Sequence, residues 1–137
     1  MPNNPHNIKI KVVEEALSSA GITFGSLKDD PFGAITAVGD PMMPAAAGLI
    51  CGAAENVPVL MAGGTQMGAV LNIVKSISPR SLDHVAIGTT RWILEDKSSS
   101  IRGMVSNIAG IPILAADLDF SKSRFDGLKA YELGWAK

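Results

Sequence analysis

The hydrophobic pattern of residues 57–77 predicts a buried strand that turns directly into a helix. An unbroken apolar run over residues 57–61 is typical of a parallel strand that is covered on both faces. Gly63, Gly64 and Thr65 then link this strand to the predicted helix. The apolar positions of the helix recur three and four residues apart and mark one face: Met67, Val70, Leu71, Val74 and Ile77.

Upstream of this unit the pattern predicts three helices. The first is amphipathic, with apolar residues from Ile8 to Leu17 on one face, and Gly21 ends it. An Asp-Pro pair at residues 30–31 opens the second helix, and another at residues 40–41 opens the third, because Asp suits the N-cap and Pro the first helical position. These two helices extend to about residues 38 and 54.

Downstream, strand and helix patterns alternate again. Residues 84–87 and 111–115 predict strands, and the first of them ends in a polar turn, Gly88-Thr89-Thr90. A serine cluster caps a helix over residues 101–108, and Ser123 with Asp126 resembles a capping box for a last helix through Trp135. The alternation predicts a three-layer α/β/α, Rossmann-like fold with a mostly parallel sheet.

In such a fold, ligands bind beyond the carboxyl ends of the strands, where the Gly63-Gly64-Thr65 and Gly88-Thr89-Thr90 segments are expected to meet. Glycines let a ligand approach the backbone, and the N-terminus of the following helix favours an anion such as phosphate. The alternative is an ordinary strand-to-helix turn in which Thr65 is the N-cap. Asp117, after the third strand, either orients a ribose hydroxyl or caps its own turn.

Composition narrows the class of protein. The 137 residues are 47% hydrophobic and carry a formal net charge of −1, which predicts one α/β domain over residues 1–137. Scattered Lys and Arg residues argue against nucleic acid or an anionic membrane as a partner. No apolar segment reaches the ~20 residues needed to span a bilayer. Cys51 is the only cysteine, so we expect no disulfide and a cytoplasmic location.

The absence of known motifs argues against several kinds of cofactor site. Neither Gly-x-Gly-x-x-Gly nor Gly-x-x-x-x-Gly-Lys-Ser/Thr occurs, which argues against an NAD-dependent oxidoreductase and a nucleotide triphosphatase. His6 and His84 have no carboxylate at ligand spacing, so no metal site is expected. Lys9 lies on the polar face of the first predicted helix and is solvated unless that face turns toward the site.

Five segments in order along the chain resemble the nicotinate-nucleotide:dimethylbenzimidazole phosphoribosyltransferase family, especially its archaeal and cyanobacterial branch of uncharacterised proteins. They are Asn4-Pro5-His6, DPF at 30–32, GDPMMP at 39–44, AGGTQM at 62–67 and AIGTTRW at 86–92. The resemblance implies transfer of phosphoribose from nicotinate mononucleotide to dimethylbenzimidazole without a cofactor, which supplies the lower-ligand nucleotide of cobalamin. The positions that it implies for substrate or phosphate contacts are Gly63, Gly64, Thr65, Thr89, Thr90 and Lys9.

The chain also departs from this family. The family's catalytic glutamate belongs to a Glu-Gly-x-Gly motif, expected immediately after a segment like residues 130–137, and the family's upstream half has no counterpart here. We therefore assign no catalytic residue: Glu132 is expected on a solvated helix face, and Glu95 has no visible partner. Two hypotheses stay open, a substrate-binding portion of an enzyme and a non-catalytic small-ligand-binding or oligomerisation module. Apolar surface left uncovered favours a homodimer in either case.

Overall fold

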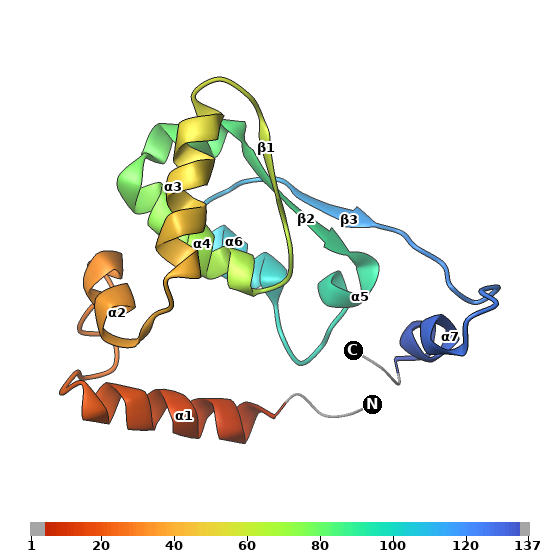
Figure 1. Cartoon of the computed structure of the whole chain (residues 1–137), viewed down its shortest axis with the longest axis horizontal. Helices are drawn as coiled ribbons and strands as arrows, with labels where there is room; N and C mark the ends of the chain where they lie inside the picture. Colours follow the sequence, from red (N-terminus) through yellow and green to blue (C-terminus); the bar gives the residue numbers. More distant parts are fainter. Residues whose placement is uncertain (1–4, 135–137) are drawn as a thin grey trace.

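A computed structural model describes residues 5–134 of the chain (Figure 1). Its three strands are β1 (Val59–Ala62), β2 (Val85–Thr90) and β3 (Ile113–Ala116). Its helices are α1 (His6–Ser19), α2 (Pro31–Val38), α3 (Met42–Ala54), α4 (Gln66–Ile77), α5 (Arg91–Leu94), α6 (Ile101–Ile108) and α7 (Asp126–Glu132), with a 3-10 helix η1 (Pro79–His84).

The three strands form one parallel sheet in the order β1-β2-β3. In the register, Met61 pairs with Ile87, and Ile87 pairs with Ile113. The chain passes from β1 to β2 through α4 and η1, and from β2 to β3 through α5 and α6 (Figure 1). The predicted α/β class, a parallel sheet flanked by helices, is confirmed.

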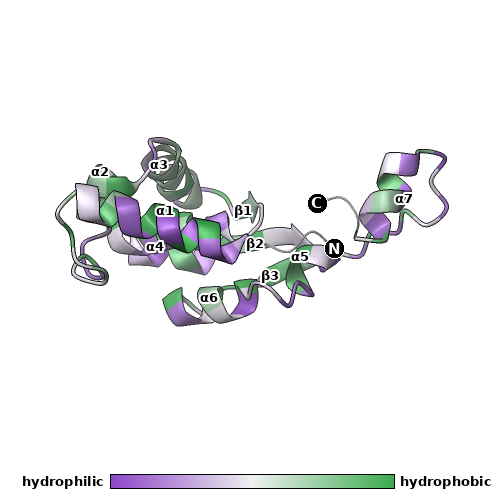
Figure 2. Cartoon of the chain, turned by 90° about the horizontal axis from the view of Figure 1, so that it is seen from below, coloured by the Kyte–Doolittle hydropathy of each residue, from purple (hydrophilic) through white to green (hydrophobic). Residues whose placement is uncertain are grey.

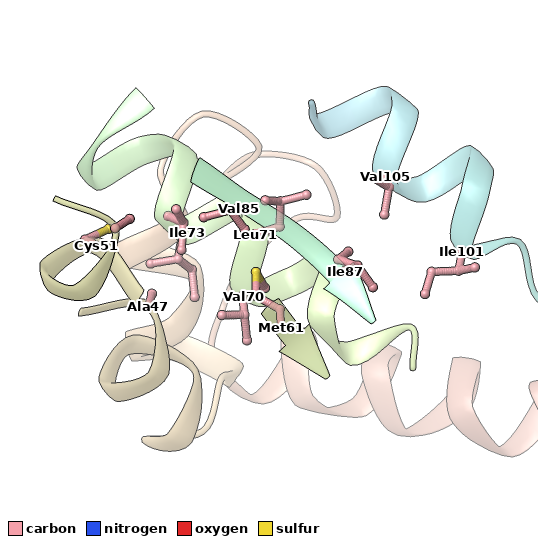
Figure 3. Packing of buried hydrophobic residues seen from close by; sticks show 12 residues of the cluster. Ala47, Cys51, Met61, Val70, Leu71, Ile73, Val85, Ile87, Ile101 and Val105 are labelled. Carbon is pink, nitrogen blue, oxygen red and sulfur yellow. The ribbon is translucent and has the colours of Figure 1, made fainter. Parts of the chain in front are cut away.

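The core lies between the sheet, α3, α4 and α6 (Figure 3). Val70, Leu71 and Val74 of α4 have no exposed surface, and Ala47 and Cys51 of α3 are buried against them. Small side chains on α3 let the two helices approach closely. Gly68 does the same for α4 and α6, because a Cβ atom built there would lie 2.2 Å from Met104 Sδ. The helical periodicity of the 57–77 segment thus identified the central helix of the protein.

The two faces of the sheet differ in burial. Met61, Val85 and Ile87 are buried on the face that packs against the helices, whereas Leu60 and Leu114 on the opposite face are each 57% exposed. The expectation that the first strand is covered on both faces is therefore wrong at Leu60. In the described part of the chain α3, α4 and α6 pack on the Met61 side, and this leaves an open sheet face.

Local signals placed several helix starts correctly. Asp30 accepts a hydrogen bond from the Gly33 N–H at 2.9 Å, and Ser100 accepts one from Gly103 at 3.0 Å, as expected of N-cap residues. Asp40 accepts from the Met42 N–H at 2.8 Å just before α3. The first helix also forms, but its apolar face stays exposed, with Ile8 65% accessible (Figure 2).

Three local predictions need correction. Residues 88–90 do not turn but continue β2, because they pair in register with β3. Thr65 stands at the N-cap of α4 without making a side-chain cap bond. Ser123 accepts from the Phe125 N–H at 3.1 Å rather than forming a capping box with Asp126. The last helix ends at Glu132, and Trp135 lies outside the described residues.

Candidate functional site

A cavity of about 610 Å³ lies on the open face of the sheet, toward the carboxyl ends of the strands. All three strands, α5 and α7 contribute to it, which agrees with the usual place of ligand sites in parallel α/β sheets. The lining residues are Leu60, Ala62, Gly63, Gly88, Thr89, Thr90, Ile93, Leu114, Ala115, Ala116 and Tyr131.

The chemistry of this lining is apolar with a few neutral polar groups. Aliphatic side chains from β1, β3 and α5 form most of the wall, and Thr89 and Thr90 supply hydroxyl groups. None of the side chains that line it within residues 5–134 is charged. A cavity of this kind favours a neutral, largely apolar group such as an aromatic ring or the face of a sugar, and it offers no cation to a phosphate.

The predicted site residues divide into two groups. Gly63, Thr89 and Thr90 line the cavity, whereas Gly64 and Thr65 follow Gly63 at the entrance to α4 and do not line it. Lys9 belongs to α1 and is not a lining residue either. Gly64 nevertheless faces the cavity wall, because a Cβ atom built on it would meet only Ile93, at 4.0 Å.

The backbone amides of the glycine turn are only partly available. The Gly63 N–H donates to the Gly88 carbonyl at 2.9 Å, so it belongs to the sheet and is not free to bind an anion. The N–H groups of Gly64, Thr65 and Gln66 have no hydrogen-bond partner among residues 5–134. Three donors therefore remain at the positive end of the α4 dipole, beside the uncharged cavity. This is a suitable place for an anion.

Thr90 carries a further unpaired polar group. Its Oγ1 atom is buried and has no hydrogen-bond partner among the described residues, and the residue lines the cavity. A buried hydroxyl without a partner costs roughly 1–3 kcal/mol. Gly88, two residues earlier in β2, lets Leu60 pass close to the strand, since a Cβ atom there would lie 3.1 Å from Leu60 Cγ. Both features shape the wall of the cavity at β2.

Arg91, directly after β2, connects three segments that are distant in the sequence. Its Nε donates to the Leu118 carbonyl at 2.8 Å, and its guanidinium forms an ion pair with Glu132 of α7. The other carboxylate oxygen of Glu132 accepts the Phe120 N–H at 3.0 Å. The hydrogen bond with Glu132 raises the pKa of Arg91 above its ordinary value. We call Arg91 and Glu132 together the α7 clasp.

Glu132 does not behave as expected from the sequence. Its side chain is only 16% exposed and both of its oxygens are engaged, so the expectation of a solvated helix face is wrong. The physical reason is its long-range pairing with Arg91, 41 residues earlier, which helical periodicity cannot reveal. These two contacts tie Glu132 to Arg91 and Phe120, and Glu132 is not among the described residues that line the cavity.

An aromatic cluster packs beside the α7 clasp. Trp92 stacks on Phe120 with ring centroids 5.4 Å apart, and Tyr131 meets Trp92 edge to face at 4.9 Å. The Arg91 guanidinium lies 4.8 Å from the Trp92 ring centroid. The sequence patterns did not predict this cluster. Two of the residues involved, Arg91 and Trp92, stand next to each other at the end of the AIGTTRW segment. Tyr131 extends the cluster to the cavity.

Neither expected role of Asp117 is supported by its contacts. Its side chain is 93% exposed, and its nearest charged group is Arg91 Nε, at 3.5 Å from Oδ1. Asp119 is the residue that caps the local turn, by accepting the Ser121 N–H at 2.8 Å. This backbone hydrogen bond lowers the pKa of the Asp119 carboxyl.

Residues 5–134 contain no group of three or more His, Cys, Asp or Glu residues placed to hold a metal ion. They also include no helix of sufficient length and hydrophobicity to cross a membrane.

The fold and cavity define the protein as a parallel α/β domain with a cavity at the strand ends. Residues 1–121 match the family DBI_PRT, described as phosphoribosyltransferase, and the chain belongs to this family. It is 48% identical to a UPF0284 protein of Methanocaldococcus jannaschii over 98% of this chain and 39% of that protein. Identity is 47% to a UPF0284 protein of Pyrococcus furiosus, over 99% of this chain and 40% of the relative.

A UPF0284 protein of Methanosarcina mazei is 45% identical over 98% of this chain and 38% of its own length. The chain thus spans about two fifths of the length of the relatives that it matches.

Proposed function

We propose that this domain binds nicotinate mononucleotide and serves the transfer of its phosphoribose to dimethylbenzimidazole. The observation that carries the proposal is the pairing of two unlike surfaces, an uncharged cavity and three unpartnered N–H groups at the start of α4. The substrate also has two parts joined by ribose, a phosphate and an aromatic ring, and the ring carries no net charge because the positive pyridinium nitrogen balances the carboxylate. Membership of a phosphoribosyltransferase family supports this match.

The reaction requires that a nitrogen of the acceptor base attacks the anomeric carbon while nicotinate leaves. Positive charge grows on the sugar, and a base takes the proton of the attacking nitrogen. In this proposal, Gly64, Thr65 and Gln66 hold the phosphate through their N–H groups, and the Thr90 hydroxyl lies at the cavity wall. The described lining residues include no carboxylate or imidazole, so they bind and orient the substrate but do not accept the proton.

A non-catalytic ligand-binding module is the second candidate. It is favoured by the absence of acidic side chains, Glu132 included, from the described cavity wall. Incubation with nicotinate mononucleotide and dimethylbenzimidazole separates the two candidates. Release of nicotinate supports the enzyme, whereas saturable binding without turnover supports the module.

Thr65 permits a sharp test of the phosphate site. Its backbone φ is −60°, which suits proline, and Gly64 before it tolerates the restriction that proline imposes. Thr65→Pro removes one N–H group from the start of α4, whereas the control Thr65→Ala removes only the hydroxyl. By calorimetry, we expect Thr65→Pro to weaken nicotinate mononucleotide binding about 10- to 100-fold. Thr65→Ala should change it only a few-fold. Equal affinities for the mononucleotide and for nicotinate riboside would contradict the phosphate site.

Self-association and a cytoplasmic location are also part of the proposal. The chain exposes 9085 Å² for 14.3 kDa, about 2,300 Å² more than the ~6,800 Å² expected of a compact protein of this mass. A stable interface buries roughly 800 Å² per partner, so the excess is large enough for a homodimer. Light scattering at high concentration tests this, and a monomer would contradict it. The single buried Cys51 agrees with a reducing compartment.

A further inference from the structure

Tyr131 is the one residue of α7 that lines the cavity. The helix projects from the end of the sheet in both views, away from the packed core (Figures 1 and 2). None of its residues belongs to the buried core cluster of the described chain. The position of Tyr131 therefore depends on a small number of side-chain contacts.

The α7 clasp supplies the polar part of these contacts. Arg91 is fixed at the end of β2 by its position in the chain and by its bond to the Leu118 carbonyl. It holds Glu132, the residue after Tyr131, while Glu132 also binds the Phe120 N–H. Since consecutive helix residues point in directions about 100° apart, fixing Glu132 orients Tyr131 toward the cavity.

The aromatic cluster supplies the apolar part. Tyr131 packs edge to face with Trp92, and its ring centroid lies 6.3 Å from that of Phe120. Apart from Tyr131, the cavity wall consists of aliphatic side chains, glycines and threonines. Tyr131 is thus the single aromatic surface that the described chain offers to a bound ligand in this cavity.

We infer that Tyr131 packs against the planar aromatic ring of the substrate and that Arg91 and Glu132 are positioning residues for it. The inference rests on the proposed function, because it takes the cavity as the place of the ring. It adds a specificity determinant, because α7 contacts the ring and the start of α4 binds the phosphate.

Two ligands separate these roles in a calorimetric titration. Nicotinate mononucleotide contains the ring and the phosphate, whereas ribose 5-phosphate lacks the ring. Tyr131→Ala should weaken binding of the mononucleotide about 3- to 10-fold, the range of one aromatic contact, and leave that of ribose 5-phosphate unchanged. Tyr131→Phe keeps the ring and should restore the affinity to within twofold of the wild type.

The positioning role is tested by Glu132→Gln, which keeps the shape and the acceptor for the Phe120 N–H but removes the charge that pairs with Arg91. It should weaken binding of the mononucleotide, as Tyr131→Ala does. The double variant should lose little more affinity than Tyr131→Ala alone. Lys129→Ala is the matched control, because Lys129 lies on the same helix and pairs only with the exposed Asp126. Thermal unfolding of each variant shows that the core is intact.

The outcomes distinguish the inference from the function on which it rests. If the wild type binds both ligands and Tyr131→Ala binds the mononucleotide normally, the inference is wrong and the function stands. An equal loss for ribose 5-phosphate, or full additivity in the double variant, would also overturn it. If the wild type binds neither ligand, both the inference and the proposed function are wrong.

Discussion

The two faces of the sheet are built in different ways. On the Met61 face, Leu71, Val85 and Ile87 are held by dense apolar packing among α3, α4 and α6 (Figure 3). On the Leu60 face, the strands are open, and α7 is held at the cavity by the α7 clasp and the aromatic cluster. The comparison teaches that the packed core lies on one face of the sheet and the proposed ligand site on the other, so the two can be changed separately.

The largest effect is expected from a substitution in the packed face. Leu71→Ala removes a fully buried side chain at the centre of the core and should destabilise the protein by about 2–5 kcal/mol. Leu60→Ala, the matched deletion on the open face, removes a side chain that is 57% exposed and should cost about 1 kcal/mol or less. Urea unfolding followed by circular dichroism measures both. Equal losses would mean that the open face is covered in solution.

A second test compares two glycines in helices. Gly68→Ala places a Cβ atom 2.2 Å from Met104 Sδ between α4 and α6 and should cost about 1–3 kcal/mol through overpacking. Gly52→Ala in α3 meets nothing within 4 Å and should stabilise the helix by about 0.5–1 kcal/mol. Thermal unfolding of the two variants should give shifts of opposite sign. A stable Gly68→Ala variant would show that Met104 moves away freely.

A third change loosens the open face alone. Arg91→Ala removes the partner of Glu132 and the bond to the Leu118 carbonyl, so α7 should detach while the core stays folded. Trypsin should then cleave after Lys122 and Arg124 several-fold faster than in the wild type, with little change in the urea midpoint. Lys129→Ala serves again as the control. A parallel drop in the urea midpoint would show that the two faces are coupled.

The smallest effect concerns pH. The Ser121 N–H lowers the folded-state pKa of Asp119, so its contribution to stability is present above the unfolded value of about 3.8 and is lost as the pH falls through the folded value. Wild type and Asp119→Ala should therefore differ in melting temperature at pH 6, by a small amount because the carboxyl is exposed, and converge toward pH 3. A difference in melting temperature that grows toward pH 3 would contradict this prediction.

Local chemistry explains why much of the fold was predictable. Asp30 and Ser100 bind backbone N–H groups three residues away, so the signal and the helix lie in the same short segment. The apolar spacing of α4 likewise predicted the burial of Val70, Leu71 and Val74, although Ile77 is 44% exposed and the buried Ile73 was not part of the predicted face. The cavity was partly predictable for a related reason. Gly63, Thr89 and Thr90 end two parallel strands, and parallel strand ends meet at one edge of a sheet.

The amino-acid sequence by itself determined the strand and helix order, the glycine turn before α4 and the motifs of the family, because these depend on neighbours in the chain. Only the tertiary structure decided that the Gly63 N–H is bound by Gly88 and that one sheet face is open. It also decided that Glu132 is only partly exposed and forms an ion pair with Arg91. Such features join residues up to 41 positions apart, and no local pattern encodes which distant partner a polar group will meet.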